Sequence, residues 1–148
     1  MKPRILVIDD EAGIRDSLRM ILEYEGYDVS SAPGGEEGIA IVEREAPEVV
    51  FLDVKMPGMD GLDVLARIKT ITDATPVIII SGHGTVSTAV EATRRGAFDF
   101  LEKPLASDRV LLTVRNALDQ RRLADENRSL KRAVEVRHEM VGASPTMR

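Results

Sequence analysis

The fold is decided by a short apolar run that ends in acidic residues, RILVIDDE, from Arg4 to Glu11. Four similar runs follow at intervals of about two dozen residues, Tyr27–Ser31, Val49–Leu52, Val77–Ile80 and Phe98–Leu101. The first, third and fourth runs are almost continuously apolar, which is typical of strands buried on both faces of a parallel sheet. We therefore expect these three strands at the centre of the sheet.

Between the runs lie segments whose apolar residues recur at helical spacing. The first contains Ile14, Leu18 and Leu22 and is expected to stop at Gly26. The others carry Ile39 and Val42, then Leu62, Leu65 and Ile68, then Val86, Val90 and Ala97. This alternation predicts an α/β fold, a doubly wound five-stranded parallel sheet with helices on both faces, because each parallel step needs a crossover. No domain boundary is expected before residue 105.

The composition excludes several classes of protein. The chain has 148 residues, of which 43% are hydrophobic and 30% charged, so one globular domain with a short extension is expected. The absence of cysteine excludes disulfides, thiolate metal sites and a cysteine nucleophile. Nothing at the N-terminus resembles a signal peptide, and no apolar run approaches the ~20 residues of a membrane helix. We expect a cytoplasmic protein with no membrane partner.

The net charge of -5 is unevenly distributed. Residues 1–119 hold 13 Lys and Arg against 21 Asp and Glu, whereas residues 120–148 hold 7 against 4. Nucleic-acid affinity comes largely from positive charges that replace counterions. The acidic body therefore argues against direct binding of nucleic acid by this chain.

The last segment contains no Gly or Pro from Leu105 to Val141. It predicts an extended C-terminal helix that begins near Asp108 and runs about 50 Å. Apolar or amide residues then recur at spacings of 4, 3 and 4, at Leu123, Asn127, Leu130 and Val134. Two interpretations stay open: one amphipathic helix that frays, or a short coiled coil between two chains in which Asn127 fixes the register.

Polar residues follow the predicted strands at their carboxyl ends, where ligands bind in open parallel sheets. They are Asp9, Asp10 and Glu11 after the first strand, Asp53 after the third, Ser81 after the fourth, and Lys103 and Pro104 after the fifth. Two carboxylates at 4 Å repel by roughly 4 kcal/mol at an effective dielectric near 20, so this rim needs a cation. Oxygen ligands of this kind suit Mg²⁺.

A cation, a lysine and a hydroxyl around one carboxylate are the groups that phosphoryl transfer requires. Asp53 stands alone and is the predicted nucleophile, whereas Asp9 and Asp10 form a pair suited to a metal. An Asp after a strand is commonly a helix cap or turn residue, and this explanation competes at each single position. It does not explain the whole set on one rim.

Four stretches resemble the receiver domain of bacterial two-component response regulators: ILVIDDE (Ile5–Glu11), FLDVKMPGMDG (Phe51–Gly61), ISG (Ile80–Gly82) and FDFLEKP (Phe98–Pro104). The resemblance covers about residues 3 to 120. It implies the flavodoxin-like receiver fold with strand order 2-1-3-4-5. It also implies that a sensor histidine kinase phosphorylates Asp53. Mg²⁺ would be held by Asp10, Asp53 and the Lys55 carbonyl directly, and by Asp9 through water.

The same resemblance implies a conformational switch. Lys103 would pair with the phosphoryl group, Ser81 would move toward it, Phe100 would turn inward, and the peptide bond before Pro104 would be cis. The remodelled surface would be the fourth helix, the fifth strand and the fifth helix. A homodimer would form through this surface and through the linker coiled coil. The chain would be a signalling domain, not an enzyme, that catalyses its own phosphotransfer and dephosphorylation.

Ser81–Leu105 closely resembles the receivers of sigma-54-dependent activators of the nitrogen-regulation type. MVGASPTMR (Met140–Arg148) resembles the start of the AAA+ ATPase domain that follows in those activators, ahead of a DNA-binding domain. The implied division is a receiver (1–120), a helical or coiled-coil linker (121–139) and a truncated AAA+ domain (140–148). A stand-alone receiver is the alternative.

Two other functions use similar residues or a similar scaffold. An aspartate-nucleophile phosphatase of the haloacid dehalogenase type places its acidic pair last, whereas Asp9 and Asp10 come first here. A phosphorylation-independent interaction module on a receiver scaffold predicts at least one missing rim residue, and none is missing. The cognate kinase, the stimulus, the promoters and the effect of phosphorylation on the dimer stay open.

Overall fold

The computed structural model describes the backbone of residues 2–82 and 86–141, and the side chains of those residues as far as residue 126. Strands and helices alternate over this range in the predicted order. The strands are β1 (Arg4–Ile8), β2 (Asp28–Ala32), β3 (Val49–Asp53), β4 (Val77–Ser81) and β5 (Asp99–Glu102). The helices are α1 (Ala12–Tyr24), α2 (Gly35–Glu45), α3 (Gly61–Ile71), α4 (Val86–Arg94) and α5 (Ser107–Val141).

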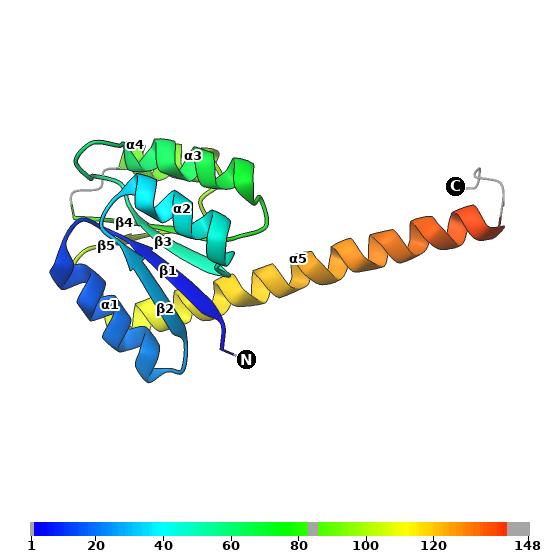
Figure 1. Ribbon diagram of the computed structural model, residues 1–148, viewed down its shortest axis with the longest axis horizontal. Coiled ribbons are helices and arrows are strands. Elements are labelled where there is room, and N and C mark those ends of the chain that lie inside the picture. Colours follow the sequence, from blue (N-terminus) through cyan, green and yellow to red (C-terminus); the bar gives the residue numbers. More distant parts are fainter. Residues whose placement is uncertain (1, 83–85, 142–148) are drawn as a thin grey trace.

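The strands form one parallel sheet in the order β2-β1-β3-β4-β5 (Figure 1). Every residue of β3 and β4 is buried, and so are the last four residues of β1. This burial confirms the prediction that these three strands lie at the centre of the sheet. The edge strands β2 and β5 each begin one residue later than predicted. Tyr27 belongs to the turn after α1, because its N–H donates to the Leu22 carbonyl at 3.1 Å. Gly26 stands in that turn with a φ of 95°, which explains why glycine ends this helix.

Helices cover both faces of the sheet (Figure 1). α2, α3 and α4 pack on one face over Leu6 and Ile8, whereas α1 and α5 pack on the other over Ile5 and Val7. The alternation along β1 thus supplies side chains to two cores. Burial of about 25 cal/mol per Å² of apolar surface in these two layers is the main force that holds the domain together.

The predicted helix α4 is present, but the apolar residues that predicted it do not form its buried face. Its apolar residues Val86 and Val90 are 82% and 52% exposed, and the helix packs on the sheet through the smaller Ala92. Ala97 lies beyond the end of the helix. Apolar spacing therefore located this helix but did not identify its buried face.

Helix α5 has 35 residues, about 52 Å at 1.5 Å per residue, and projects beyond the domain (Figure 1). It starts at Ser107, one residue before the predicted position. Val110, Val114 and Ala117 are buried against the sheet. One turn further on, the Arg121 guanidinium donates to the Thr75 hydroxyl at 2.9 Å.

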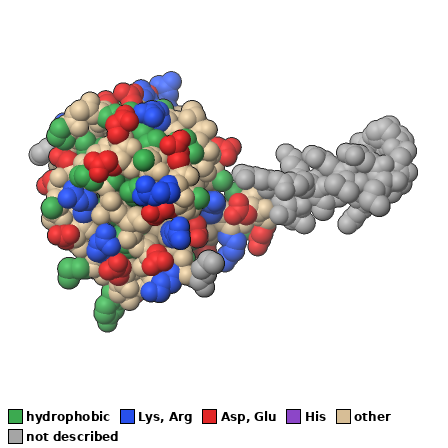
Figure 2. Space-filling model, viewed as in Figure 1, with side chains coloured by type: hydrophobic (Ala, Val, Ile, Leu, Met, Phe, Trp, Pro, Cys, Tyr) green, Lys and Arg blue, Asp and Glu red, His purple; other side chains and the backbone are tan. Residues whose placement is uncertain are grey.

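The predicted coiled-coil side chains from Asn127 to Val134, and the stretch 142–148, lie outside the residues described. The coiled coil and the division into receiver, linker and AAA+ segment therefore stay predictions. In the described part of the chain, no helix has the length and apolar character needed to cross a bilayer. On the face shown in Figure 2, acidic and basic side chains are interspersed across the domain.

Candidate functional site

The carboxyl ends of the central strands bring the predicted site residues to one rim of the sheet. Asp9 directly follows β1, and Asp53 ends the neighbouring β3. Ser81 ends β4 and pairs with Glu102, the last residue of β5. Lys103 directly follows β5 and therefore also lies at this rim. Because parallel strands all end on the same side, residues far apart in sequence become neighbours here.

Three carboxylates form an acidic cluster at this rim. Asp9, Asp10 and Asp53 each offer one oxygen, and these oxygens lie within 4.8 Å of one another. Asp9 and Asp53 are buried, whereas Asp10 is exposed. Backbone groups orient the buried pair: the Glu11 N–H donates to Asp9 Oδ1 at 2.8 Å, and the Lys55 N–H donates to Asp53 Oδ1 at 3.2 Å.

A single ammonium group lies among these carboxylates. The Lys103 Nζ is 3.0 Å from Asp9 Oδ2, 2.8 Å from Glu11 Oε1 and 3.4 Å from Asp53 Oδ2. The Lys103 ammonium thus lies beside three of the four acidic side chains at this rim, and Asp10 is the fourth.

This charge arrangement shifts the pKa of two groups. Burial, together with the nearby negative charge of Asp9, raises the pKa of Asp53 to about 6, although the Lys55 N–H and Lys103 act in the opposite direction. Burial by itself lowers the pKa of Lys103, but the contacts with Glu11, Asp9 and Asp53 outweigh it and hold that pKa above its ordinary value. Lys103 is therefore charged, and Asp53 is ionised at neutral pH at an energetic cost.

The acidic cluster fits a small divalent cation. Asp9 Oδ2 is buried, and it lies 3.0 Å from the Lys103 ammonium without the alignment of a hydrogen bond. Three carboxylates whose oxygens lie this close together repel one another, and a bound divalent cation would offset that repulsion. The available donors are all oxygens, which Mg²⁺ prefers. Asp9, Asp10 and Asp53 are the residues that would hold it.

The predicted switch residues Ser81 and Phe100 lie on the neighbouring strands β4 and β5. Ser81 is buried and lines a hollow of about 140 Å³ with Lys55 and Thr88. Phe100 pairs with Ile79, two residues before Ser81 on β4, and packs half-buried on the core under α2, α3 and α4. The Lys103-Pro104 peptide bond is cis, as the resemblance implied.

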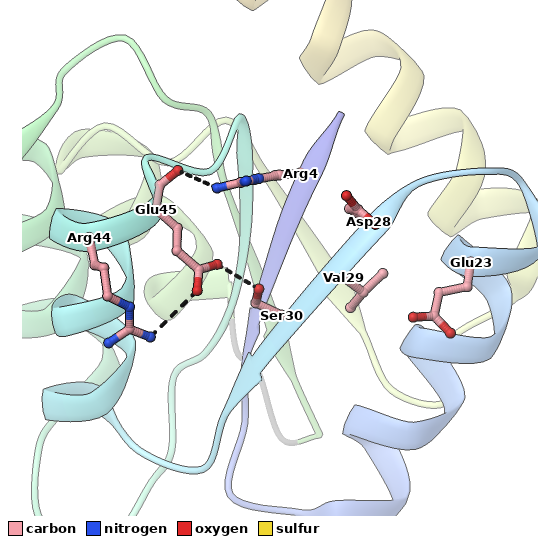
Figure 3. A pocket seen from close by; sticks show the side chains of 7 residues that line it. All are labelled: Arg4, Glu23, Asp28, Val29, Ser30, Arg44 and Glu45. Atoms are coloured by element: carbon pink, nitrogen blue, oxygen red, sulfur yellow. Dashed lines mark hydrogen bonds and ion pairs between the residues drawn. The ribbon is translucent and has the colours of Figure 1, made fainter. Parts of the chain in front are cut away.

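A larger hollow of about 490 Å³ lies elsewhere, between β2 and the ends of α1 and α2 (Figure 3). Some of its polar groups bond to one another: the Ser30 hydroxyl donates to the Glu45 carboxylate at 2.7 Å, and Arg4 donates to the Glu45 carbonyl at 3.2 Å. It contains none of the predicted site residues, so size alone does not identify the functional site.

The sequence analysis assigned no role to two residues that contact the site, Glu11 and Arg15. Glu11 makes the shortest contact with Lys103, and the Arg15 guanidinium donates to the Asp9 carbonyl at 2.6 Å. The position of Glu11 after two aspartates was a signal that it lies at the rim. No pattern in the sequence indicated the contact of Arg15.

The fold and the rim together define a receiver domain, and comparison with known families agrees. Residues 5–115 match the response regulator receiver domain, and the chain belongs to this family. It is 38% identical to the C4-dicarboxylate transport transcriptional regulatory protein DctD of Rhizobium meliloti, over 98% of this chain and 32% of that protein. It is 42% identical to the nitrogen assimilation regulatory protein NtrX of Azorhizobium caulinodans, over 95% of this chain and 31% of that protein.

Solved structures give the same result. The crystal structure of NtrX from Brucella abortus in complex with ADP matches 88% of this chain and 30% of that chain, with a TM-score of 0.84 and 43% identity. A CheY-like receiver domain protein from Methanospirillum hungatei matches 84% of this chain and 99% of that chain, with a TM-score of 0.81 and 30% identity. The predicted family, fold and likeness to nitrogen regulators are thereby confirmed. The chain spans about a third of the length of these curated relatives.

Proposed function

We propose that this chain accepts a phosphoryl group on Asp53 from a phosphohistidine of a sensor kinase and thereby controls transcription. The observation that carries the proposal is the position of Asp53. It is buried between the acidic pair and the Lys103 ammonium, with the Ser81 hydroxyl on the neighbouring strand end.

In the transfer step, an Asp53 oxygen attacks phosphorus, an O–P bond forms, and the N–P bond of the phosphohistidine breaks. The imidazole nitrogen keeps the bonding electron pair and takes up a proton. Asp53 must be ionised to attack, and with a pKa of about 6 it is ionised at neutral pH. Lys103 offers its positive charge to the phosphoryl oxygens. Bound Mg²⁺ supplies further positive charge to these oxygens.

Phosphorylation then acts as a switch. The new oxygens on Asp53 offer acceptors to Ser81 and Lys103, which bond to them in only one of two packings, and the population shifts toward that packing. Phe100 turns inward as Ser81 moves. The exposed Val86 and Val90 on α4 and Leu112 on α5 support a homodimer surface formed by α4, β5 and α5.

In this proposal the chain is the receiver and linker of a sigma-54-dependent activator, with AAA+ and DNA-binding domains elsewhere in the full protein. The linker contributes a coiled coil to the dimer. The chain acts on no external substrate, and it catalyses only its own phosphorylation and dephosphorylation. Kinship with receiver domains supports a cytoplasmic location, with no membrane partner and no direct contact of this chain with nucleic acid.

The test is the intact mass of the protein after incubation with acetyl phosphate and Mg²⁺. One added phosphoryl group is expected, and it should be absent from Asp53→Ala and from protein treated with EDTA. A folded wild type that gains no mass under any condition would overturn the proposal in favour of a phosphorylation-independent interaction module.

A further inference from the structure

Glu11 stands at the start of α1 but does not cap that helix with its side chain. Its backbone carbonyl accepts the Arg15 N–H at 3.1 Å, whereas its side chain makes no capping hydrogen bond. A residue at this position ordinarily uses a side-chain oxygen to satisfy a free N–H of the first turn. The Glu11 carboxylate instead extends across the mouth of the acidic site to Lys103.

The distances from the Lys103 ammonium rank its partners. Its contact with Glu11, at 2.8 Å, is the shortest, and the contact with Asp53, at 3.4 Å, is the longest. Charge-assisted N–H···O bonds of full strength measure about 2.7–2.9 Å. The Glu11 contact falls in that range, the contact with buried Asp9, at 3.0 Å, lies just outside it, and the Asp53 contact is clearly longer. The ammonium is therefore shared between Glu11 at the mouth of the site and Asp9 in its interior, and it lies farther from the acceptor Asp53.

The Glu11 carboxylate and the Lys103 ammonium that it contacts differ in their exposure to water. The Glu11 side chain is 61% exposed, whereas the side chains of Asp53 and Lys103 are 4% and 12% exposed. An ion pair with a solvated carboxylate is weak, because water competes for both charges. Glu11 thus retains Lys103 without locking it in place.

We propose that Glu11 is a positioning residue that competes with the incoming phosphoryl group for Lys103 and so slows phosphorylation. This inference rests on the proposed function of Asp53. Before transfer the ammonium is shared between Glu11 and the buried aspartates. To stabilise the charge that develops on the phosphoryl oxygens it must leave Glu11, and loss of that contact subtracts from the stabilisation that Lys103 provides.

The experiment compares Glu11→Gln with the wild type at saturating Mg²⁺. Intact mass is followed over time with acetyl phosphate as the donor. Removal of an exposed ion pair predicts phosphorylation about two- to five-fold faster in the variant. The matched control is Glu23→Gln, which removes the same charge and an ion pair with Arg19 (3.3 Å) at the opposite end of α1. It should leave the rate unchanged.

A second readout reports the contact itself. The Lys103 ammonium signal in the ¹⁵N spectrum of the metal-free protein should shift in Glu11→Gln and stay in place in Glu23→Gln. An unchanged or slower rate in Glu11→Gln, while the wild type is phosphorylated, overturns the inference. A Lys103 ammonium signal that does not shift in Glu11→Gln also overturns the inference. Failure of the proposed function has a different result, because the wild type itself then gains no phosphoryl group.

Discussion

Replacement of Asp53 by Asn should stabilise the metal-free protein at neutral pH. The folded environment raises the pKa of this carboxyl from 3.8 to about 6, chiefly through burial and the charge of Asp9. At about 1.4 kcal/mol per pH unit, ionised Asp53 destabilises the folded state by up to about 3 kcal/mol. Asn keeps the shape and an acceptor for the Lys55 N–H but loses the attraction to Lys103, so we expect a gain of about 1–3 kcal/mol.

The gain should depend on pH in a defined direction. A carboxyl with a raised pKa holds its proton more tightly in the folded state than in the unfolded state. The penalty of ionised Asp53 is therefore absent below about pH 4, grows between pH 4 and 6, and is fully present above that range. Relative to the wild type, Asp53→Asn should gain most above pH 6 and little near pH 4.

Urea unfolding in EDTA, followed by circular dichroism, measures both quantities at about pH 7.5 and about pH 4.5. Asp16→Asn, at an exposed position of α1, is the control for loss of one negative charge. The reasoning is refuted if Asp53→Asn is no more stable than the wild type at the higher pH. A gain of equal size at both pH values also refutes it.

Other perturbations have equally direct readouts. Mg²⁺ at about 100 times its dissociation constant should raise the unfolding free energy of the wild type by about 2.7 kcal/mol in thermal scans and that of Asp53→Asn by less. Gly61→Ala should destabilise the domain by more than about 2 kcal/mol in urea, since the new Cβ would clash with the Asp53 carbonyl oxygen and the Val54 backbone. Gly13→Ala, in open space, should stabilise the domain by up to about 1 kcal/mol. Arg121→Ala should speed amide hydrogen exchange in α5 near residue 121, whereas Arg122→Ala, which loses only a surface pair, should not.

The first residue of a strand was predicted more accurately for strands with a neighbouring strand on each side than for strands at the edge of the sheet. The central strands begin at the predicted residues, because burial on both faces leaves an unbroken apolar run such as Val77–Ile80. The edge strand β2 pairs on one side only and reads DVSSA, so its limits depend on the turn that precedes it. The sequence did not reveal that the Tyr27 N–H is used by the end of α1.

The predicted site residues converge for a similar reason, because the ends of parallel strands share one rim whatever lies between them. What the pattern cannot give is the direction of a long side chain. Glu11 was visible as the third acidic residue after β1, but its choice between capping α1 and contacting Lys103 depends on a residue 92 positions away. The contact between Arg15 and the Asp9 carbonyl depends on how α1 leans on the sheet, which spacing does not encode.

Helix α5 has the geometry of a lever, and its fulcrum is the contact between Arg121 and Thr75, where the helix leaves the domain. Beyond Arg121 it continues for about 30 Å to Val141, so a tilt of about 5° at the fulcrum displaces the far end by roughly 2.6 Å. The fulcrum rests on Thr75, two residues before β4, and the opposite end of β4 is Ser81 at the acidic rim. A single buried strand therefore spans the distance between the rim and the pivot, and a small displacement of that strand is enlarged at the end of the lever.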